Sequence, residues 1–178
     1  MTLLQNSFNK RTPAAKLAES GVLVALALIF SYIENLIPIP IPVPGVKLGL
    51  ANLVTLMGLF FLSPIQVLLI LVTRIILAGF MFGNLSTIIY SLAGGLVSLL
   101  IMIIAKKCKL FSPLGVSILG GVFHNIGQLA IAMLVLKSFA LITYLPLLLI
   151  IGAISGSLIG IAGKALTKYM YRKQKSDL

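Results

Sequence analysis

The sequence predicts an all-α, polytopic membrane protein with six transmembrane helices and a proline-rich loop on the outer side of the bundle. The first observation behind this prediction is composition: 60% of the 178 residues are hydrophobic and only 10% are charged, a balance typical of membrane proteins. The second is that long apolar runs are separated by prolines, glycines and clusters of lysine. We expect one compact unit, with a cytoplasmic tail over residues 1–13, a membrane domain over 14–168 and a basic cytoplasmic tail over 169–178.

Six segments approach the length of about 20 apolar residues that a spanning helix needs. They are Leu17–Ile37, Leu48–Leu62, Pro64–Phe82, Leu85–Ala105, Leu114–Leu136 and Leu141–Leu166. The first is longer than the apolar core of a signal peptide and further spans follow it, so we expect it to be retained. The second is short and ends where Ser63 precedes Pro64, a pair that resists helical backbone. A re-entrant hairpin would also explain this break, but we expect two helices joined by a minimal turn.

The connection between the first two spans reads IPIPIPVPG, with a proline at every second position from Pro38 to Pro44. Proline lacks a backbone N–H and fixes φ, so this segment is not a helix interior. Backbone without hydrogen-bond partners is not tolerated against lipid. Since a proline-rich extended segment is stiff and loses little entropy on ordering, we expect it to cover the mouth of a pocket, with Lys47 and Asn52 as polar contacts at its end.

The cationic residues are distributed unequally over the two sides of the membrane. If the N-terminus is cytoplasmic, Lys47 and Lys137 lie outside and Arg74 lies within a span, which leaves 11 of the 14 Lys and Arg residues inside. The positive-inside rule therefore predicts that both termini are cytoplasmic. Because these charges flank the spans, they face lipid headgroups, and nucleic acid is not an expected partner.

Ionisable side chains at membrane depth are costly and usually mark a binding site or a pathway. Arg74 follows Pro64 by ten residues, about 15 Å along a helix and hence near the midplane, and His124 lies at a similar depth. We expect a polar pocket that opens to the outside and is closed below. The candidate ligand-binding residues are Arg74, His124, Asn125, Gln128, Lys47, Asn52, Glu34 and Asn84.

Two alternatives remain open for these residues. They could form separate interhelical hydrogen bonds, each a modest structural contact, and Glu34 could be the counter-ion of Arg74 or Lys47. If they do bind a ligand, Arg74 and Lys47 favour an anionic one, and the apolar proline-rich segment favours one with a flat or greasy part.

Small residues recur at helical spacing on two spans, and such faces allow close approach of helix backbones. On the last span these are Gly152, Gly156 and Gly160, which we interpret as packing within the bundle. On the first span the small residues are Ala14, Ala18, Gly21 and Ala25.

The strings SYIENLIPIPIPVPGVKLGLANLVTLMGLF, TRIILAGFMFGN and SPLGVSILGGVFHNIGQLAIA resemble the Gx transporter family, also labelled heptaprenyl diphosphate synthase component I. The resemblance runs from about Ala14 to Gly163. That family is grouped with the substrate-binding S components of energy-coupling-factor (ECF) vitamin transporters, which are six-helix bacterial membrane proteins. By this resemblance, the small residues of the first span would dock on a transmembrane coupling subunit that two ATPases drive.

The resemblance implies a protein that binds a vitamin- or cofactor-like molecule from outside and hydrolyses no ATP, in the cytoplasmic membrane of a bacterium. An alternative is a non-catalytic membrane subunit that supports quinone or prenyl synthesis, or flavin-based extracellular electron transfer, together with a redox or quinone-synthesis partner. The third possible function is that of a lone channel or scaffold.

The residues argue against catalysis by this chain alone. Prenyl elongation needs acidic clusters that hold magnesium on a diphosphate, whereas the three acidic residues are Glu19, Glu34 and Asp177. The lone Cys108, which we place on a cytoplasmic loop, and the lone His124 offer no zinc site and no two-sided ligation of a redox cofactor. We therefore expect no metal and no cofactor.

Overall fold

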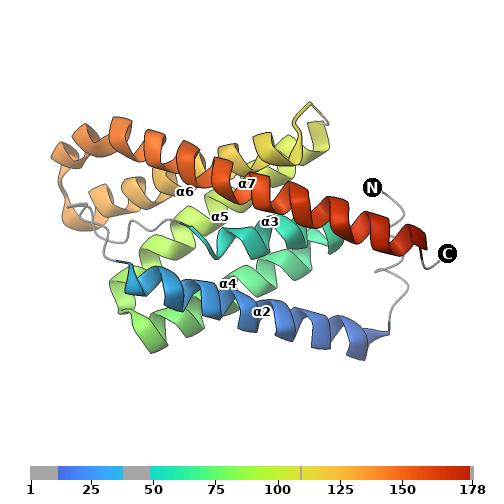
Figure 1. Cartoon of the computed structure of the whole chain (residues 1–178). Helices are drawn as coiled ribbons and strands as arrows, with labels where there is room; N and C mark the ends of the chain where they lie inside the picture. Colours follow the sequence, from blue (N-terminus) through green and yellow to red (C-terminus); the bar gives the residue numbers. More distant parts are fainter. Residues whose placement is uncertain (1–11, 38–48, 109, 177–178) are drawn as a thin grey trace.

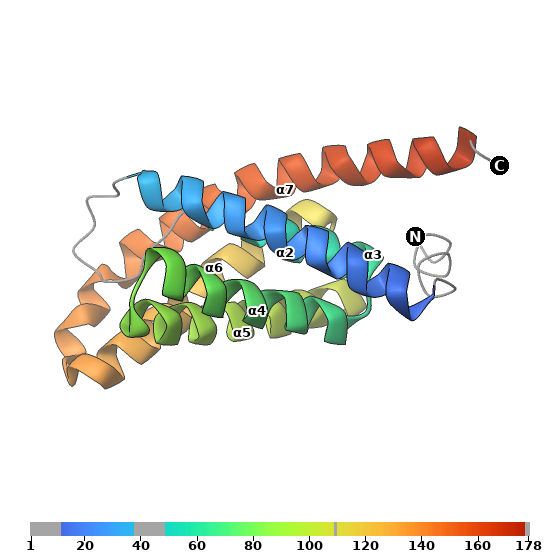
Figure 2. The ribbon, with the colours of Figure 1, turned by 90° about the horizontal axis from the view of Figure 1, so that it is seen from below.

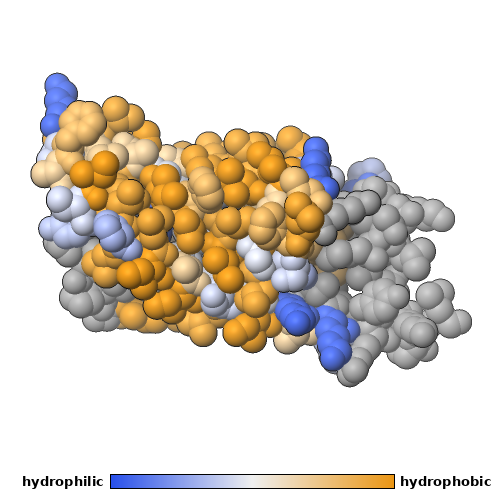
Figure 3. Space-filling view, turned by 90° about the horizontal axis from the view of Figure 1, so that it is seen from above, coloured by the Kyte–Doolittle hydropathy of each residue, from blue (hydrophilic) through white to orange (hydrophobic). Residues whose placement is uncertain are grey.

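The structure, a computed structural model, describes residues 12–37, 49–108 and 110–176, and almost all of them are helical (Figure 1). The helices are α2 (Pro13–Leu36), α3 (Asn52–Phe61), α4 (Pro64–Phe82), α5 (Leu85–Cys108), α6 (Pro113–Leu136), the short 3₁₀ helix η1 (Phe139–Tyr144) and α7 (Leu145–Ser176). Among the described residues, five segments are long and apolar enough to cross a bilayer: α2, α4, α5, α6 and the stretch Phe139–Leu166. On the face that Figure 3 shows, the surface between the two ends of the bundle is mostly apolar, as contact with lipid requires. The chain is an all-α, multi-pass membrane protein.

Three of the helices begin with the same local signal, a Ser or Thr followed by Pro. Thr12, Ser63 and Ser112 precede α2, α4 and α6, and each side chain accepts a backbone N–H of the first turn. Proline is well suited to the first helical position, where its missing N–H is not needed. These three starts lie at one end of the bundle (Figure 1), which we call the capped end; the opposite end is the far end.

Several helix ends extend beyond the spans expected from the sequence. Helix α2 begins at Pro13 instead of Leu17, α5 continues to Cys108 instead of Ala105, and α7 continues to Ser176 instead of Leu166. The apolar run marks only the part of a helix that lies in lipid, because a helix continues into water wherever its terminal N–H and C=O groups are capped or hydrated. The C-terminal part of α7 extends beyond the other helices in this way (Figure 2).

The second expected span, Leu48–Leu62, is not confirmed as a span. Gly49 has a φ of 80° and is followed by a turn, so α3 starts only at Asn52 and ends at Phe61. At 1.5 Å per residue this helix is about 15 Å long, half of the hydrocarbon core. Eight of its ten residues are buried: Asn52, Val54, Thr55, Leu56, Gly58, Leu59, Phe60 and Phe61. Helix α3 is therefore an interior half-helix.

Close packing among α5, α6 and α7 depends on glycine. A Cβ atom at Gly156 would lie 2.7 Å from the Ser117 carbonyl oxygen, and one at Gly152 would lie 2.8 Å from that of Gly121. A Cβ at Gly94 on α5 would likewise lie 2.7 Å from the His124 carbonyl oxygen. The interpretation of the glycine face on the last span as internal packing is confirmed.

A lysine from another helix caps the C-terminal end of α3. The Lys106 ammonium, near the end of α5, donates a hydrogen bond of 2.5 Å to the Leu59 carbonyl and lies 5.4 Å from the centre of the Phe60 ring. The last carbonyls of a helix have no intrahelical partner and carry its negative dipole end, so a cation is the natural group to cap them.

We expect Lys106→Gln to lower the free energy of unfolding by about 1 kcal/mol, since an interhelical hydrogen bond of this kind contributes roughly that amount. The matched control is Lys107→Gln, which removes the same charge from an exposed neighbouring position. Thermal unfolding in detergent measures both variants. Equal melting temperatures for the two would show that the contact with Leu59 does not stabilise α3.

The first and last described helices both reach the capped end (Figure 1), where Lys16, Lys106, Lys107, Lys164 and Lys168 also lie. We expect this end to face the cytoplasm, by the positive-inside rule.

The orientation can be tested with an impermeant thiol reagent on intact cells, in a Cys108→Ala background. Lys47→Cys and Lys137→Cys are expected to be labelled, whereas Lys107→Cys and Lys173→Cys are expected to react only after lysis. Labelling of Lys107→Cys from outside would reverse the orientation.

Candidate ligand-binding site

A small cavity lies where α2, α3, α4, α5 and α6 meet. Its volume is about 20 Å³, which is room for about one water molecule. The polar residues that line it are Ser31, Glu34, Asn52, Arg74, Thr87, Ser91 and His124. Because these side chains come from five helices and face one point, the cavity is the polar centre of an otherwise apolar bundle.

The α3–α4 hairpin brings Asn52 and Arg74 together. Asn52 precedes the turn residue Ser63 by as many positions as Arg74 follows it. The two antiparallel helices therefore place them at the same height, and the Arg74 Nη2 donates a hydrogen bond of 3.2 Å to the Asn52 Oδ1. Only 8% of Arg74 is exposed, and its Nε has no hydrogen-bond partner among the described residues. The guanidinium thus retains a donor at the cavity.

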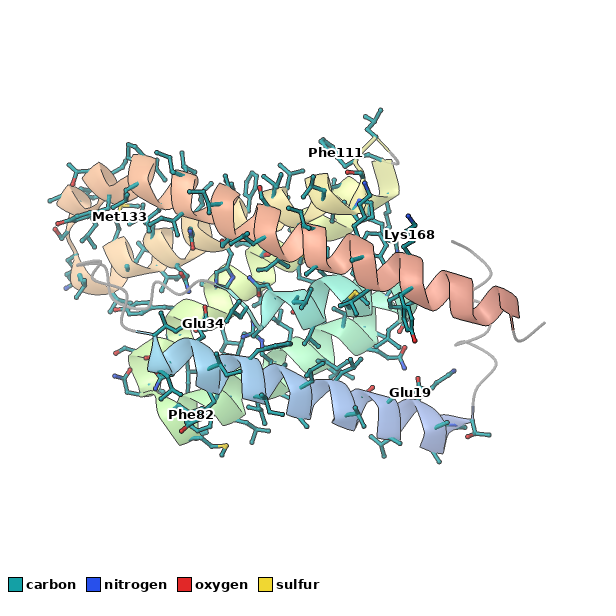
Figure 4. The ribbon with its side chains drawn as sticks, viewed as in Figure 1. Glu19, Glu34, Phe82, Phe111, Met133 and Lys168 are labelled. Atoms are coloured by element: carbon teal, nitrogen blue, oxygen red, sulfur yellow. The ribbon has the colours of Figure 1, made fainter. Side chains whose placement is uncertain are left out.

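Glu34, at the far end of α2, joins this group from the opposite side. Its carboxylate Oε1 accepts the backbone N–H of Gly49, just before α3, and its negative charge attracts Arg74. Figure 4 shows Glu34 on the side of α2 that faces the bundle. Since Ala51 at the start of α3 has no side-chain acceptor, Glu34 also supplies negative charge near the positive end of the α3 dipole. This supports the counter-ion alternative for Glu34 with Arg74.

His124 reaches the cavity from α6, and Gly94 makes the approach possible. A Cβ at Gly94 would come within 3.2 Å of the His124 Cε1, so a larger residue at this position would displace the imidazole. His124 is buried.

The hydroxyl groups of the cavity were not among the expected site residues. Ser31 lies one helical turn before Glu34, and Thr87 and Ser91 lie one turn apart on α5. The Ser31 Oγ is buried and has no hydrogen-bond partner among the described residues. The spacing of three between Ser31 and Glu34, which puts both on one face of α2, is the signal that could have found it.

Three other expected ligand-binding residues, Asn84, Asn125 and Gln128, lie outside the cavity lining. Asn125 is buried and donates a hydrogen bond of 2.8 Å to the Leu148 carbonyl, which joins α6 to α7. Gln128 is buried against Gly94, outside the cavity lining. Asn84 is exposed and caps α5, since its Oδ1 accepts the Thr87 N–H at 2.9 Å. Lys47 and the prolines from Pro38 to Pro44 lie outside the described residues. The structure therefore brings together Glu34, Asn52, Arg74 and His124.

The small residues of α2 face outward. Ala14, Ala18, Gly21 and Ala25 are all exposed, and no atom of the described residues outside α2 comes within 4 Å of a Cβ placed at Gly21. This arrangement is the opposite of that on α7, where the glycines contact α6. The face on α2 is thus available to lipid or to another protein.

The described residues contain no group of three or more His, Cys, Asp or Glu side chains that could hold a metal ion. The fold and the cavity define a class of protein: a multi-pass α-helical membrane protein with a buried polar site at the junction of its helices. The chain belongs to the heptaprenyl diphosphate synthase component I family, whose sequence profile matches residues 23–166. No curated protein and no solved structure matches the chain.

Proposed function

We propose that the chain is a substrate-binding component of an ECF-like importer, which binds a small, anionic, vitamin- or cofactor-like molecule from outside and hydrolyses no ATP. The observation that carries this proposal is the buried Arg74, whose Nε has no hydrogen-bond partner among the described residues, in a polar cavity that five helices line. Arginine at membrane depth is rare and usually functional, and a guanidinium binds carboxylate or phosphate with directed hydrogen bonds.

The size of the cavity limits what can enter it. Ligand pockets usually measure about 300–1,000 Å³, whereas this cavity measures about 20 Å³. Only an oxygen of the ligand's anionic end could take this place without movement of the protein. Binding of the whole molecule therefore requires the far ends of α2, α4 and α5 to separate, while the capped end stays closed.

Docking on a coupling subunit is the second part of the proposal. The exposed small-residue face of α2, from Ala14 to Ala25, would allow helices of a partner to approach closely. Such a surface suits transmission of movement between subunits, because backbones in close contact shift together.

The family match favours a second candidate, a non-catalytic membrane subunit of a prenyl diphosphate synthase. With Glu19, Glu34 and Asp177 as its acidic residues, the chain would leave the magnesium-dependent chemistry to its partner. A ligand with a diphosphate end and an apolar chain would also suit Arg74 in a lipid-embedded cavity.

Purification of the tagged protein from its native membrane tests both candidates, with mass spectrometry of the bound proteins and small molecules. We expect a transmembrane coupling protein, ATPases and one anionic small molecule. A soluble prenyl synthase subunit in their place would support the second candidate, and a redox partner would support a role in electron transfer. Release of a bound molecule by Arg74→Gln would locate it at the cavity; retention would place its site elsewhere.

A further inference from the structure

A second groove lies at the capped end, between the start of α6 and the later part of α7. Its volume is about 320 Å³, and Leu114, Ile161, Lys164, Ala165 and Lys168 line it. The floor is apolar and continues into the lipid-facing surface of α7, where Leu158 and Ile161 are exposed. Figure 4 shows Lys168 on the side of α7 toward the start of α6. The groove therefore crosses from the apolar belt to the charged end of the bundle.

The rim of this groove is positively charged, and no carboxylate lies nearby in the sequence. Lys164 and Lys168 are four residues apart on one helix face, a spacing at which like charges repel. The positive end of the α6 dipole adds to this field. Neither α6 nor α7 contains an Asp or Glu. An anion between the two ammonium groups would relieve the repulsion.

We propose that this groove binds an anionic phospholipid, with the lipid phosphate at Lys164 and Lys168 and the first part of an acyl chain along Ile161 and Ala165. Basic pockets between transmembrane helices are suited to anionic headgroups. The apolar floor, which a soluble anion would not use, distinguishes a lipid from free phosphate. The larger groove between α4 and α5, about 430 Å³, has no charged residue in its lining and so lacks a headgroup site.

Native mass spectrometry of the detergent-purified protein tests the proposal, with phosphatidylglycerol and phosphatidylcholine of identical acyl chains as probes. The Lys164→Gln/Lys168→Gln double variant is expected to weaken phosphatidylglycerol binding about 30-fold, the equivalent of about 2 kcal/mol for two lysines. The charge-matched control is Lys16→Gln/Lys107→Gln, at the same end of the bundle, which is expected to retain most of the binding.

A second variant tests the apolar floor without a change of charge. Ala165→Phe is expected to fill the groove and weaken phosphatidylglycerol binding, whereas Leu100→Phe, in the groove between α4 and α5, is expected not to. Because Ala165 and Leu100 are both exposed, neither change disturbs the core. The proposal is overturned if the charge-matched control loses as much binding, if phosphatidylcholine binds equally well, or if millimolar inorganic phosphate displaces the lipid.

Discussion

The Arg74→Gln variant is expected to lose the rise in melting temperature that ligand produces in the wild-type protein. Loss of one partner of a buried charged contact costs about 2–5 kcal/mol, which is on the order of 30-fold or more in affinity. Glutamine keeps an uncharged polar group in the cavity, and the Glu34 carboxylate keeps the backbone N–H of Gly49 as a hydrogen-bond partner, so most of the ligand-free melting temperature should remain. Thermal unfolding with and without ligand measures both quantities.

Asn125→Ala is the matched control, because Asn125 is buried on the same membrane helix as His124 but bonds to Leu148. Its loss is expected to lower the ligand-free melting temperature by the equivalent of about 1 kcal/mol and to leave the ligand-induced shift intact. If Arg74→Gln fails to insert or collapses without ligand, Arg74 is a structural residue paired with Glu34. The ligand site must then be sought around Lys47 and Asn52.

The second large effect is expected for Gly21→Leu, which should abolish capture by the partner subunit while the protein remains folded and inserted. Gly21 is exposed, and a Cβ atom placed there has no atom of the described residues outside α2 within 4 Å, so the free energy of unfolding should change by less than about 1 kcal/mol. It would hold the helices of the partner away from a surface of small residues. Co-purification with the tagged partner, together with a melting curve, measures the effect, and Ala18→Leu should behave in the same way.

Gly156→Leu provides the contrast. A side chain there would collide with the backbone of α6 at Ser117 and Ile118, and overpacking of this kind costs about 1–3 kcal/mol or more. This variant is therefore expected to be unstable, with loss of partner capture as a consequence. Normal capture by Gly21→Leu and Ala18→Leu would mean that this face of α2 contacts only lipid.

The rarity of charge in the membrane made part of the site predictable. Arg74, His124, Glu34 and Asn52 stand out in an apolar chain, and the structure brings all of them to one cavity. Ser31 was missed because a hydroxyl on a helix is common and can bond to the preceding turn. Only its spacing of three from Glu34, which puts both residues on one face of α2, distinguishes Ser31 from other helical serines.

Two other differences between the predictions from sequence and the structure have equally simple causes. His124 and Asn125 are adjacent in sequence, but neighbouring residues on a helix point in different directions. Only the positions of α5 and α7 decide that His124 reaches the cavity while Asn125 reaches Leu148. Helix α3 was expected as a span because its residues are apolar, and an interior helix and a lipid-facing one have the same composition.

The burial of α3 has a consequence for biogenesis. A helix of ten residues is too short for the translocon to release into the bilayer as a span of its own, and its partners α2, α4, α5 and α7 are not yet assembled when it emerges from the ribosome. It must therefore enter the bundle after the long helices have inserted, in a late folding step. Variants that weaken α3 are then expected to reach the membrane in normal amounts and with normal topology. They are expected to lack a formed cavity and to be early targets of quality-control proteases.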